Sequence, residues 1–274
     1  RNLIMVVQHN LSAMNTNRQM GVVTNALQKS TEKLSSGYKI NRAADDAAGL
    51  SISEKMRSQI RGLNKASDNA QDGISLIQVA EGALNETHSI LQRMNELATQ
   101  AANDTNTSVD RQSIKDEIKQ LNEELDRISS TTQFNKQDLL TGGFSGKLQV
   151  GALEGQTMDV KISLAVSAKG LKVSAVEVST NAKAGAAMQS IQDAIESVSK
   201  QRSKLGAIQN RLEHTINNLD TNAENTQAAE SRIRDTDMAD EMVQYSKNNI
   251  LSQAGQSMLT QANQQTQGVL SLLQ

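Results

Sequence analysis

"MRSQIRGLNKASDNAQDGISLIQVAEGALNETHSILQRMNELATQ", residues 56–100, decides the fold of this chain. Positions seven apart in it carry the apolar residues Met56, Leu63, Ala70, Ile77, Leu84, Leu91 and Ala98. A second set of positions seven apart is offset by four residues from the first. It begins with the apolar Ile60 and is polar from Glu81 onward. A seven-residue repeat is typical of helices that pack along their whole length. We therefore predict one helix of about 50 residues, roughly 75 Å long at 1.5 Å per residue.

Two further stretches repeat apolar residues at spacings of three and four. The first follows a polar break at residues 103–108, and we expect Ser108 or Asp110 to cap its N-terminus. Its apolar positions are Ile114, Ile118, Leu121, Leu125 and Ile128. The second carries Met188, Ile191, Ile195, Val198, Leu205, Leu212, Ile216 and Leu219, with Arg202 and Gln209 in two of its slots. Three such helices predict a mainly α fold, an elongated antiparallel bundle or coiled-coil rod.

Between the second and third helices the apolar period changes to two. Residues 147–150, 158–163 and 171–178 alternate in polarity, and glycines separate them. Alternation of this kind indicates short strands. We expect a small β-hairpin element within residues 141–183, too small to be stable as an independent domain.

Composition limits the possible functions. The chain has 274 residues, a formal net charge of -2, no cysteine, no proline and four aromatic residues, Tyr38, Phe134, Phe144 and Tyr245. The absence of a basic excess gives no basis for a nucleic-acid or membrane partner. Without cysteine there are no disulfides or thiolate metal sites. The apolar run at residues 3–7 is too short for a signal-peptide core or a membrane span, so a secreted chain would need another export signal.

The two ends carry loose helical stripes that are poor in apolar area. Residues 6–36 place apolar side chains at Val7, Leu11, Met14, Val22, Ala26 and Leu34. Residues 237–273 do so at Met238, Met242, Val243, Ile250, Leu251, Ala254, Met258, Ala262, Val269 and Leu273. Both ends are rich in Asn, Gln, Ser and Ala, so neither buries enough surface to fold alone. We expect both ends to need partners.

No constellation in the sequence predicts catalysis, a metal or a cofactor. Asp45 and Asp46 are adjacent, but no histidine or third carboxylate lies near them, and a polar turn with capping carboxylates is the better interpretation. The histidines at 9, 88 and 214 are widely separated, and His88 occupies a heptad slot typical of an interface. Phosphate-loop, dinucleotide and serine-hydrolase motifs are absent. We therefore expect a protein that is not an enzyme.

A kinked polar connection is predicted between the N-terminal stripe and the long helix. Gly37 and Gly49 bracket it, and its polar members are Asn41, Arg42, Asp45 and Asp46. Their side chains can satisfy backbone groups at a hinge or spoke.

Long stretches of the chain resemble bacterial flagellin. They include "NLSAMNT" at 10–16, "LSSGYKINRAADDAAGLSISEKMRSQIRGL" at 34–63, "RISSTTQFNKQDLL" at 127–140 and "AESRIRDTDMADEMVQYSKNNILSQAGQSMLTQANQ" at 229–264. The resemblance covers nearly the whole chain and implies a short form that lacks large variable outer domains. The implied parts are 5–40, a filament-core helix; 41–51, a spoke; 52–140, half of the rod; 141–183, hairpins; 184–234, the other half; and 235–274, a second filament-core helix.

The resemblance also implies a function and partners. It implies a structural subunit that leaves the cell through the flagellar type III apparatus and polymerises into the filament. Its core-assembly residues would be Leu11, Met14, Val22, Ile250, Leu251, Met258, Val269 and Leu273. Further implied partners are an export chaperone, the filament cap and hook-filament junction proteins. The alternatives are a hook-filament junction protein, an enzyme, for which residues are lacking, and a soluble binding module.

One helical segment is similar to the part of flagellin that docks on the innate immune receptor Toll-like receptor 5. Gln92, Arg93, Glu96 and Leu97 match that motif, Met94 lies within it, and Glu117 matches a supporting acidic residue. The plain alternative is the solvated face of a rod helix. Arg93 and Leu97 are four residues apart, so we expect them to form an exposed pair on one side of the helix. Because that side would also pack between subunits, the receptor would bind monomers.

Overall fold

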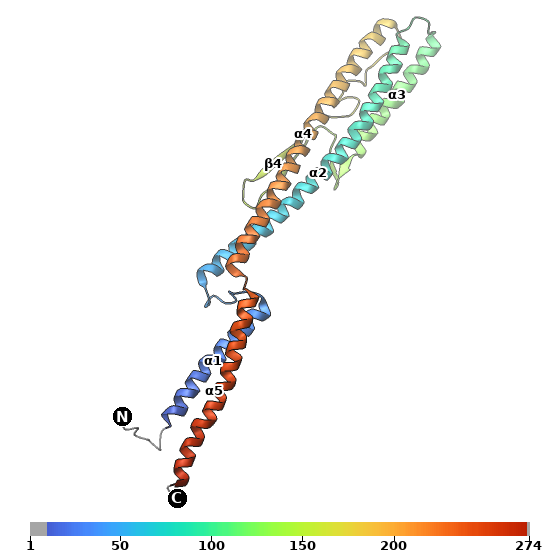
Figure 1. Ribbon diagram of the computed structural model, residues 1–274. Coiled ribbons are helices and arrows are strands. Elements are labelled where there is room, and N and C mark those ends of the chain that lie inside the picture. The colour runs from blue at the N-terminus through green and yellow to red at the C-terminus, as the bar shows by residue number, and fades with distance from the viewer. Residues whose placement is uncertain (1–9, 273–274) are drawn as a thin grey trace. The chain divides into compact units, whose positions relative to one another are not determined.

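The computed structural model describes residues 10–272, with side chains described as far as residue 265. This part of the chain forms two units, a first unit of the described residues up to 58 and from 226 onward, and a second unit of residues 59–225. Its helices are α1 (Leu11–Ser36), α2 (Ala47–Ala101), α3 (Ser108–Thr131), α4 (Asn181–Arg234) and α5 (Met238–Leu272) (Figure 1). Its strands are β1 (Gln133–Phe134), β2 (Gln137–Asp138), β3 (Phe144–Gln149) and β4 (Thr157–Ile162). The mainly α fold predicted from periodicity is confirmed.

The heptad column of α2 is the centre of the second unit. From residue 63 onward every predicted position of the column is buried: Leu63, Ala70, Ile77, Leu84, Leu91 and Ala98. In α4 the matching column is Ala184, Ile191, Val198, Leu205, Leu212 and Leu219, also buried throughout. The two helices are antiparallel, since Ser67 donates to Asp220 at 3.0 Å and Asn181 donates to the Ala102 carbonyl.

The second buried column of α2 differs from the predicted one. It lies three residues after the first column, not four, and contains Ala66, Gly73, Ala80, Thr87, Met94 and Ala101. Small side chains dominate this column because neighbouring segments approach α2 closely there. A methyl group on Gly73 would stand 2.3 Å from Leu148 Cδ1 of β3. In the predicted register Ser67 is buried, but the other positions, such as Ile60, Ile74 and Glu81, are only half-buried.

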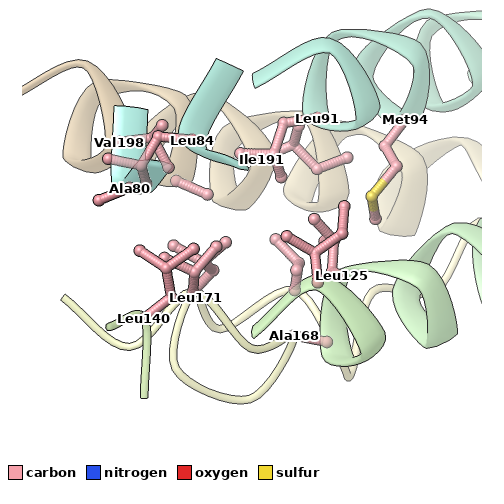
Figure 2. Close-up of a cluster of buried hydrophobic side chains, with 14 of the residues drawn as sticks. Ala80, Leu84, Leu91, Met94, Leu125, Leu140, Ala168, Leu171, Ile191 and Val198 are labelled. Carbon is pink, nitrogen blue, oxygen red and sulfur yellow. The ribbon is translucent and has the colours of Figure 1, made fainter. Parts of the chain in front are cut away.

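The core is closed by α3 and by the segment around β3 and β4. Figure 2 shows Ile191 and Val198 of α4 beside Ala80, Leu84 and Leu91 of α2, with Leu125, Leu140, Ala168 and Leu171 facing them. The buried polar side chains of the described second unit are Ser67, Thr87, Ser129 and Gln201. Gln201 of α4 is 4% exposed, and its amide donates to the Lys161 carbonyl of β4 at 3.4 Å. The core therefore joins all the elements of the second unit.

Neither of the predicted N-cap residues of α3, Ser108 and Asp110, is the cap. Thr107 is the cap, and its hydroxyl accepts from the Asp110 amide at 3.3 Å. The Asp110 carboxylate accepts in return from the Thr107 amide at 2.9 Å. The reciprocal pair is a capping box, in which the acidic residue occupies the third helical position and not the cap itself.

The strands differ from prediction in two places. β3 and β4 form the expected antiparallel hairpin, with Phe144 opposite Ile162. Residues 171–178 are turns and not a strand, because their amides bond locally, as when Val173 donates to the Ala168 carbonyl at 2.9 Å. The alternation there reflects burial of Leu171, Val173 and Val178. A small hairpin, β1–β2, was not predicted; its turn holds Asn135 and Lys136 at positive φ.

The first prediction tests the packed column. Leu84→Ala should lower the free energy of unfolding by about 2–5 kcal/mol, because it leaves a cavity where α2 and α4 meet. Val79→Ala, on an exposed face of the same helix, should change it by about 1 kcal/mol or less. Urea denaturation followed by circular dichroism measures both. Equal losses from the two variants would contradict the packing described here.

Candidate assembly and receptor-binding surfaces

In the first unit, α1 and α5 lie side by side and antiparallel (Figure 1). Asn10 donates to the Ala262 carbonyl at 2.8 Å near one end of the pair, and Lys33 lies 3.3 Å from Glu241 near the other. Between them, a methyl group on Gly255 would be 3.8 Å from Met20 Cγ. The helices thus meet over nearly the whole of α1.

This pairing buries very little apolar surface. Of the described side chains of the first unit, the buried apolar ones are Ile40 and Ala262. Ten large apolar side chains remain exposed: Leu11, Met14, Val22, Ile52, Met238, Met242, Val243, Ile250, Leu251 and Met258. The second unit exposes Val79, Val109 and Leu153. Large exposed apolar patches mark interaction sites in soluble proteins, so the α1–α5 pair is a candidate assembly surface.

The residues predicted for assembly lie on this surface where the structure describes them. Leu11, Met14 and Val22 are at least 60% exposed, as are Ile250 and Met258, and Leu251 is 44% exposed. Val269 and Leu273 lie outside the residues whose side chains are described.

The polar connection between α1 and α2 has the predicted capping role. Gly37, at φ 75°, ends α1 in the left-handed conformation that glycine favours. The Asp45 carboxylate accepts from the amides of Arg42 at 3.0 Å and Asn41 at 3.3 Å, and these bonds lower its pKa. Asp46 accepts from the Gly49 amide at 2.9 Å, at the start of α2. The carboxylates are structural.

An arginine that the sequence did not single out joins three segments of the first unit. Arg234 donates to Glu54 at 2.7 Å, and its guanidinium lies 4.7 Å from the centroid of the Tyr38 ring. The Arg234 carbonyl also accepts from the Lys39 amide at 2.7 Å. The hydrogen bond from Arg234 is the main cause that lowers the pKa of Glu54. No local pattern signals this cluster, because its members are far apart in the sequence.

On the second unit, Arg93 forms the centre of an exposed charged cluster. Its guanidinium lies 2.9 Å from Glu117 of α3 and 3.1 Å from Glu96, one turn along α2. These hydrogen bonds, chiefly the one to Glu117, raise the pKa of Arg93. Gln92 is exposed beside His88, with 3.0 Å between their side-chain nitrogens. The structure thus brings Gln92, Arg93, Glu96 and Glu117 to one surface.

The predicted exposure of Leu97 is wrong. Leu97 is 2% exposed and Met94 is 0% exposed, and both belong to the apolar core. The cause is the second buried column of α2, in which small residues dominate and to which Met94 belongs. Together with the first column it makes the buried face of α2 wider than predicted, and Leu97 lies on that face. Arg93 therefore stands without Leu97 on the surface, and any contact with a receptor there is polar.

The described part of the chain has neither a cluster of side chains suited to bind a metal ion nor a membrane-spanning helix. Residues 10–272 contain no group of three acidic or histidine side chains placed to hold a metal ion. Of the histidines, His88 is half-buried and His214 is exposed, while His9 lies outside the described residues. None of the described helices is both long and apolar enough to cross a membrane.

These features are typical of a class of helical structural proteins that expose large apolar side chains on a helix pair. Two family models match this chain, the bacterial flagellin N-terminal helical region over residues 7–145 and the C-terminal helical region over residues 188–273. The chain belongs to the bacterial flagellin family. It is accordingly a structural protein and not an enzyme, a self-polymerising subunit of the flagellar filament.

Individual relatives agree with this assignment. A flagellin of Halalkalibacterium halodurans is 56% identical, over 98% of this chain and the whole of the relative. A flagellin of Bacillus subtilis is 51% identical, with the same coverage. The crystal structure of Bacillus cereus flagellin matches with a TM-score of 0.51 at 34% identity, covering 60% of this chain and 94% of that one. A putative flagellar hook-associated protein from Vibrio parahaemolyticus, at 15% identity, TM-score 0.60 and coverage of 70% and 100%, shares the fold.

The second prediction concerns the Arg234 cluster. The pKa of Glu54 in the folded chain lies below its ordinary 4.5, so its ion pair stabilises at pH values above 4.5 and is lost as the pH falls through the folded pKa. Glu54→Gln should therefore lower the thermal midpoint at neutral pH, and by less as the pH falls below 4.5 toward about 3.

Circular dichroism at the two pH values measures the effect. Glu86→Gln, at an exposed carboxylate of the same helix, is the control and should show no such pH-dependent difference. A Glu54→Gln effect of equal size at both pH values would contradict the ion-pair interpretation.

Proposed function

We propose that this subunit acts outside the cell and that the α1–α5 pair is the surface through which it joins the flagellar filament. The observation that carries the proposal is the contrast in burial: ten large apolar side chains are exposed on the first unit, against two buried apolar residues. Covering one such side chain is worth about 1.5–3 kcal/mol. Neighbouring copies of the chain are the partner that a polymer supplies at every position.

In this proposal, assembly and helix ordering are coupled. A helix pair with so little buried apolar surface is marginal by itself, because conformational entropy opposes it. Copies that cover the exposed faces would stabilise both helices. Residues 5–40 and 235–274 would then form the inner part of the filament, and residues 41–51 the connection to the outer part.

The same surface accounts for the other proposed partners. An apolar face that is exposed before assembly promotes unwanted association. An export chaperone that covers residues 235–274 would prevent this, and the filament cap and junction proteins would meet the same faces at the two ends of the polymer. The alternative of a hook-filament junction protein has weaker support, because the flagellins are 56% and 51% identical and the hook-associated protein only 15%.

The third prediction tests the assembly surface. A triple variant, Leu11→Gln, Val22→Gln and Ile250→Gln, should raise the critical concentration for polymerisation at least about tenfold, since each change removes an apolar contact between copies. Sedimentation of polymer after salting-out measures it. The thermal midpoint should hardly change, because these side chains are exposed in the single chain.

Val109→Gln is the matched control. Val109 is 71% exposed but belongs to α3 in the second unit, and its replacement should leave assembly unchanged. Polymerisation of the triple variant at the same critical concentration as the unmodified chain would refute the proposed surface.

We also infer a second role, as a ligand of Toll-like receptor 5. The similarity of residues 91–98 to the receptor-docking segment of flagellins carries this inference. The geometry supports it: Arg93 is exposed, and Glu117 and Glu96 hold its side chain in one orientation. A side chain ordered before binding loses less conformational entropy in a complex. The binding residues would be Gln92, Arg93, Glu96 and Glu117, supported from beneath by Met94 and Leu97.

The fourth prediction separates binding from packing. Arg93→Ala should weaken the affinity of the monomer for the receptor ectodomain at least about tenfold, as expected for a central interface arginine. Arg127→Ala is the control, because Arg127 forms a similarly exposed ion pair with Glu124 on α3. Surface plasmon resonance gives both affinities. If Arg93→Ala binds as tightly as Arg127→Ala, the receptor site lies elsewhere.

A further inference from the structure

Among the described residues, the exposed methionines all lie in the first unit, which also holds the half-buried Met20 and Met56. The sequence has ten methionines and neither cysteine nor tryptophan, so thioethers are its principal oxidisable side chains. In the second unit, Met94 and Met158 are buried and Met188 is half-buried. The exposed methionines of the described residues all lie on α1 and α5: Met14 (64%), Met238 (47%), Met242 (51%) and Met258 (61%).

These four methionines form two groups along the helix pair. The contacts of Asn10 with Ala262 and of Met20 with Gly255 bracket one level of the pair. Met14 and Met258 fall between these contacts, so they lie at the same level. Met238 and Met242 are four residues apart and therefore share one face of α5, near its first turn. Thioethers thus occur near both ends of the candidate assembly surface.

We propose that Met14, Met238, Met242 and Met258 are oxidation sites through which hydroperoxides prevent free subunits from assembling. The inference rests on the proposed function of the α1–α5 surface. In the reaction, the sulfur lone pair attacks one peroxide oxygen, a sulfur–oxygen bond forms and the oxygen–oxygen bond breaks. The departing hydroxide takes the proton of the oxygen now bound to sulfur, which leaves the sulfoxide and water; an organic hydroperoxide releases an alcohol in the same way. The sulfur loses two electrons, and the peroxide gains them.

The effect on assembly follows from polarity. A sulfoxide is polar and accepts hydrogen bonds, whereas the thioether it replaces is an apolar contact. Burying a polar group without a partner is unfavourable, so an oxidised face loses affinity for a neighbouring copy. The single chain should keep its fold at the same dose, because Met94 and Met158 of the core are shielded from solvent.

Assembly should also protect the same sulfurs. Once neighbouring copies cover α1 and α5, peroxide reaches their methionines slowly. Oxidation would thus act on subunits before they are incorporated and would spare those already in the polymer. Because methionine sulfoxide can be reduced enzymatically, the block should be reversible.

The test uses the full-length chain and hydrogen peroxide. Monomers are treated, the peroxide is removed, sulfoxide at each methionine is measured by peptide mass spectrometry, and the critical concentration is measured by sedimentation. We expect sulfoxide mainly at the four sites and a rise in critical concentration of at least about tenfold. Methionine sulfoxide reductase should restore the untreated value, and filaments treated at the same dose should carry less sulfoxide at the four sites.

Two variants identify the responsible residues. The quadruple variant Met14→Leu, Met238→Leu, Met242→Leu and Met258→Leu keeps the surface apolar and should assemble normally after peroxide treatment. The control Met94→Leu with Met158→Leu should remain peroxide-sensitive. Continued sensitivity of the quadruple variant, or wild-type assembly unaffected by oxidation at the four sites, would overturn the inference. Failure of untreated chain to polymerise would instead refute the proposed function on which it rests.

Discussion

Close packing along the small-residue column of α2 is the constraint on which the second unit depends. Where Ala66, Gly73, Ala80 and Ala101 face inward, neighbouring segments can approach the helix backbone, and Leu148 fills the space above Gly73. The larger residues of the first column then fill the space toward α4 and α3. Small residues in one column and large ones in the next let a protein with four aromatic residues reach a close-packed core.

The first unit lacks such an arrangement, and the difference in packing corresponds to a difference in role. Its helices meet along polar and small residues, such as Asn10, Lys33 and Gly255, and leave their larger apolar side chains in solvent. One unit buries most of its large apolar side chains within a single copy, and the other leaves many of its own exposed, as the proposed assembly surface requires. Relatives that are flagellins along their whole length make a polymer the natural setting for that surface.

Sequence reasoning was most accurate where the signal was large and regular. The first column of α2 was predicted correctly from Leu63 onward, and so were the α4 positions Ile191, Val198, Leu205, Leu212 and Leu219, because Leu and Ile recur at fixed spacing. The other predicted α4 positions, Met188, Ile195, Arg202, Gln209 and Ile216, are only half-buried. The second column was missed because Ala, Gly and Thr are not recognised as core residues by hydrophobicity alone, and the wrong exposure of Leu97 followed from this. The contacts of Arg234 and the pairing of Arg93 with Glu117 depend on tertiary structure, so no local pattern reveals them. The turns at 171–178 mimic a strand because their burial alternates without a partner strand.

The buried amide of Gln201 has a consequence for how α4 can move. Columns of Ile, Val and Leu repeated every seven residues are nearly interchangeable, so a long helix could in principle slide by one heptad and still fill its neighbour's grooves. Gln201, three residues after Val198 of the column, is a buried polar side chain on the same inward side of α4, and its amide donates to the Lys161 carbonyl. A slide of seven residues would leave the amide unpaired in an apolar environment and place an aliphatic residue at the carbonyl. The buried amide of Gln201 thus opposes axial sliding of α4, and so favours a fixed length in a subunit of a filament.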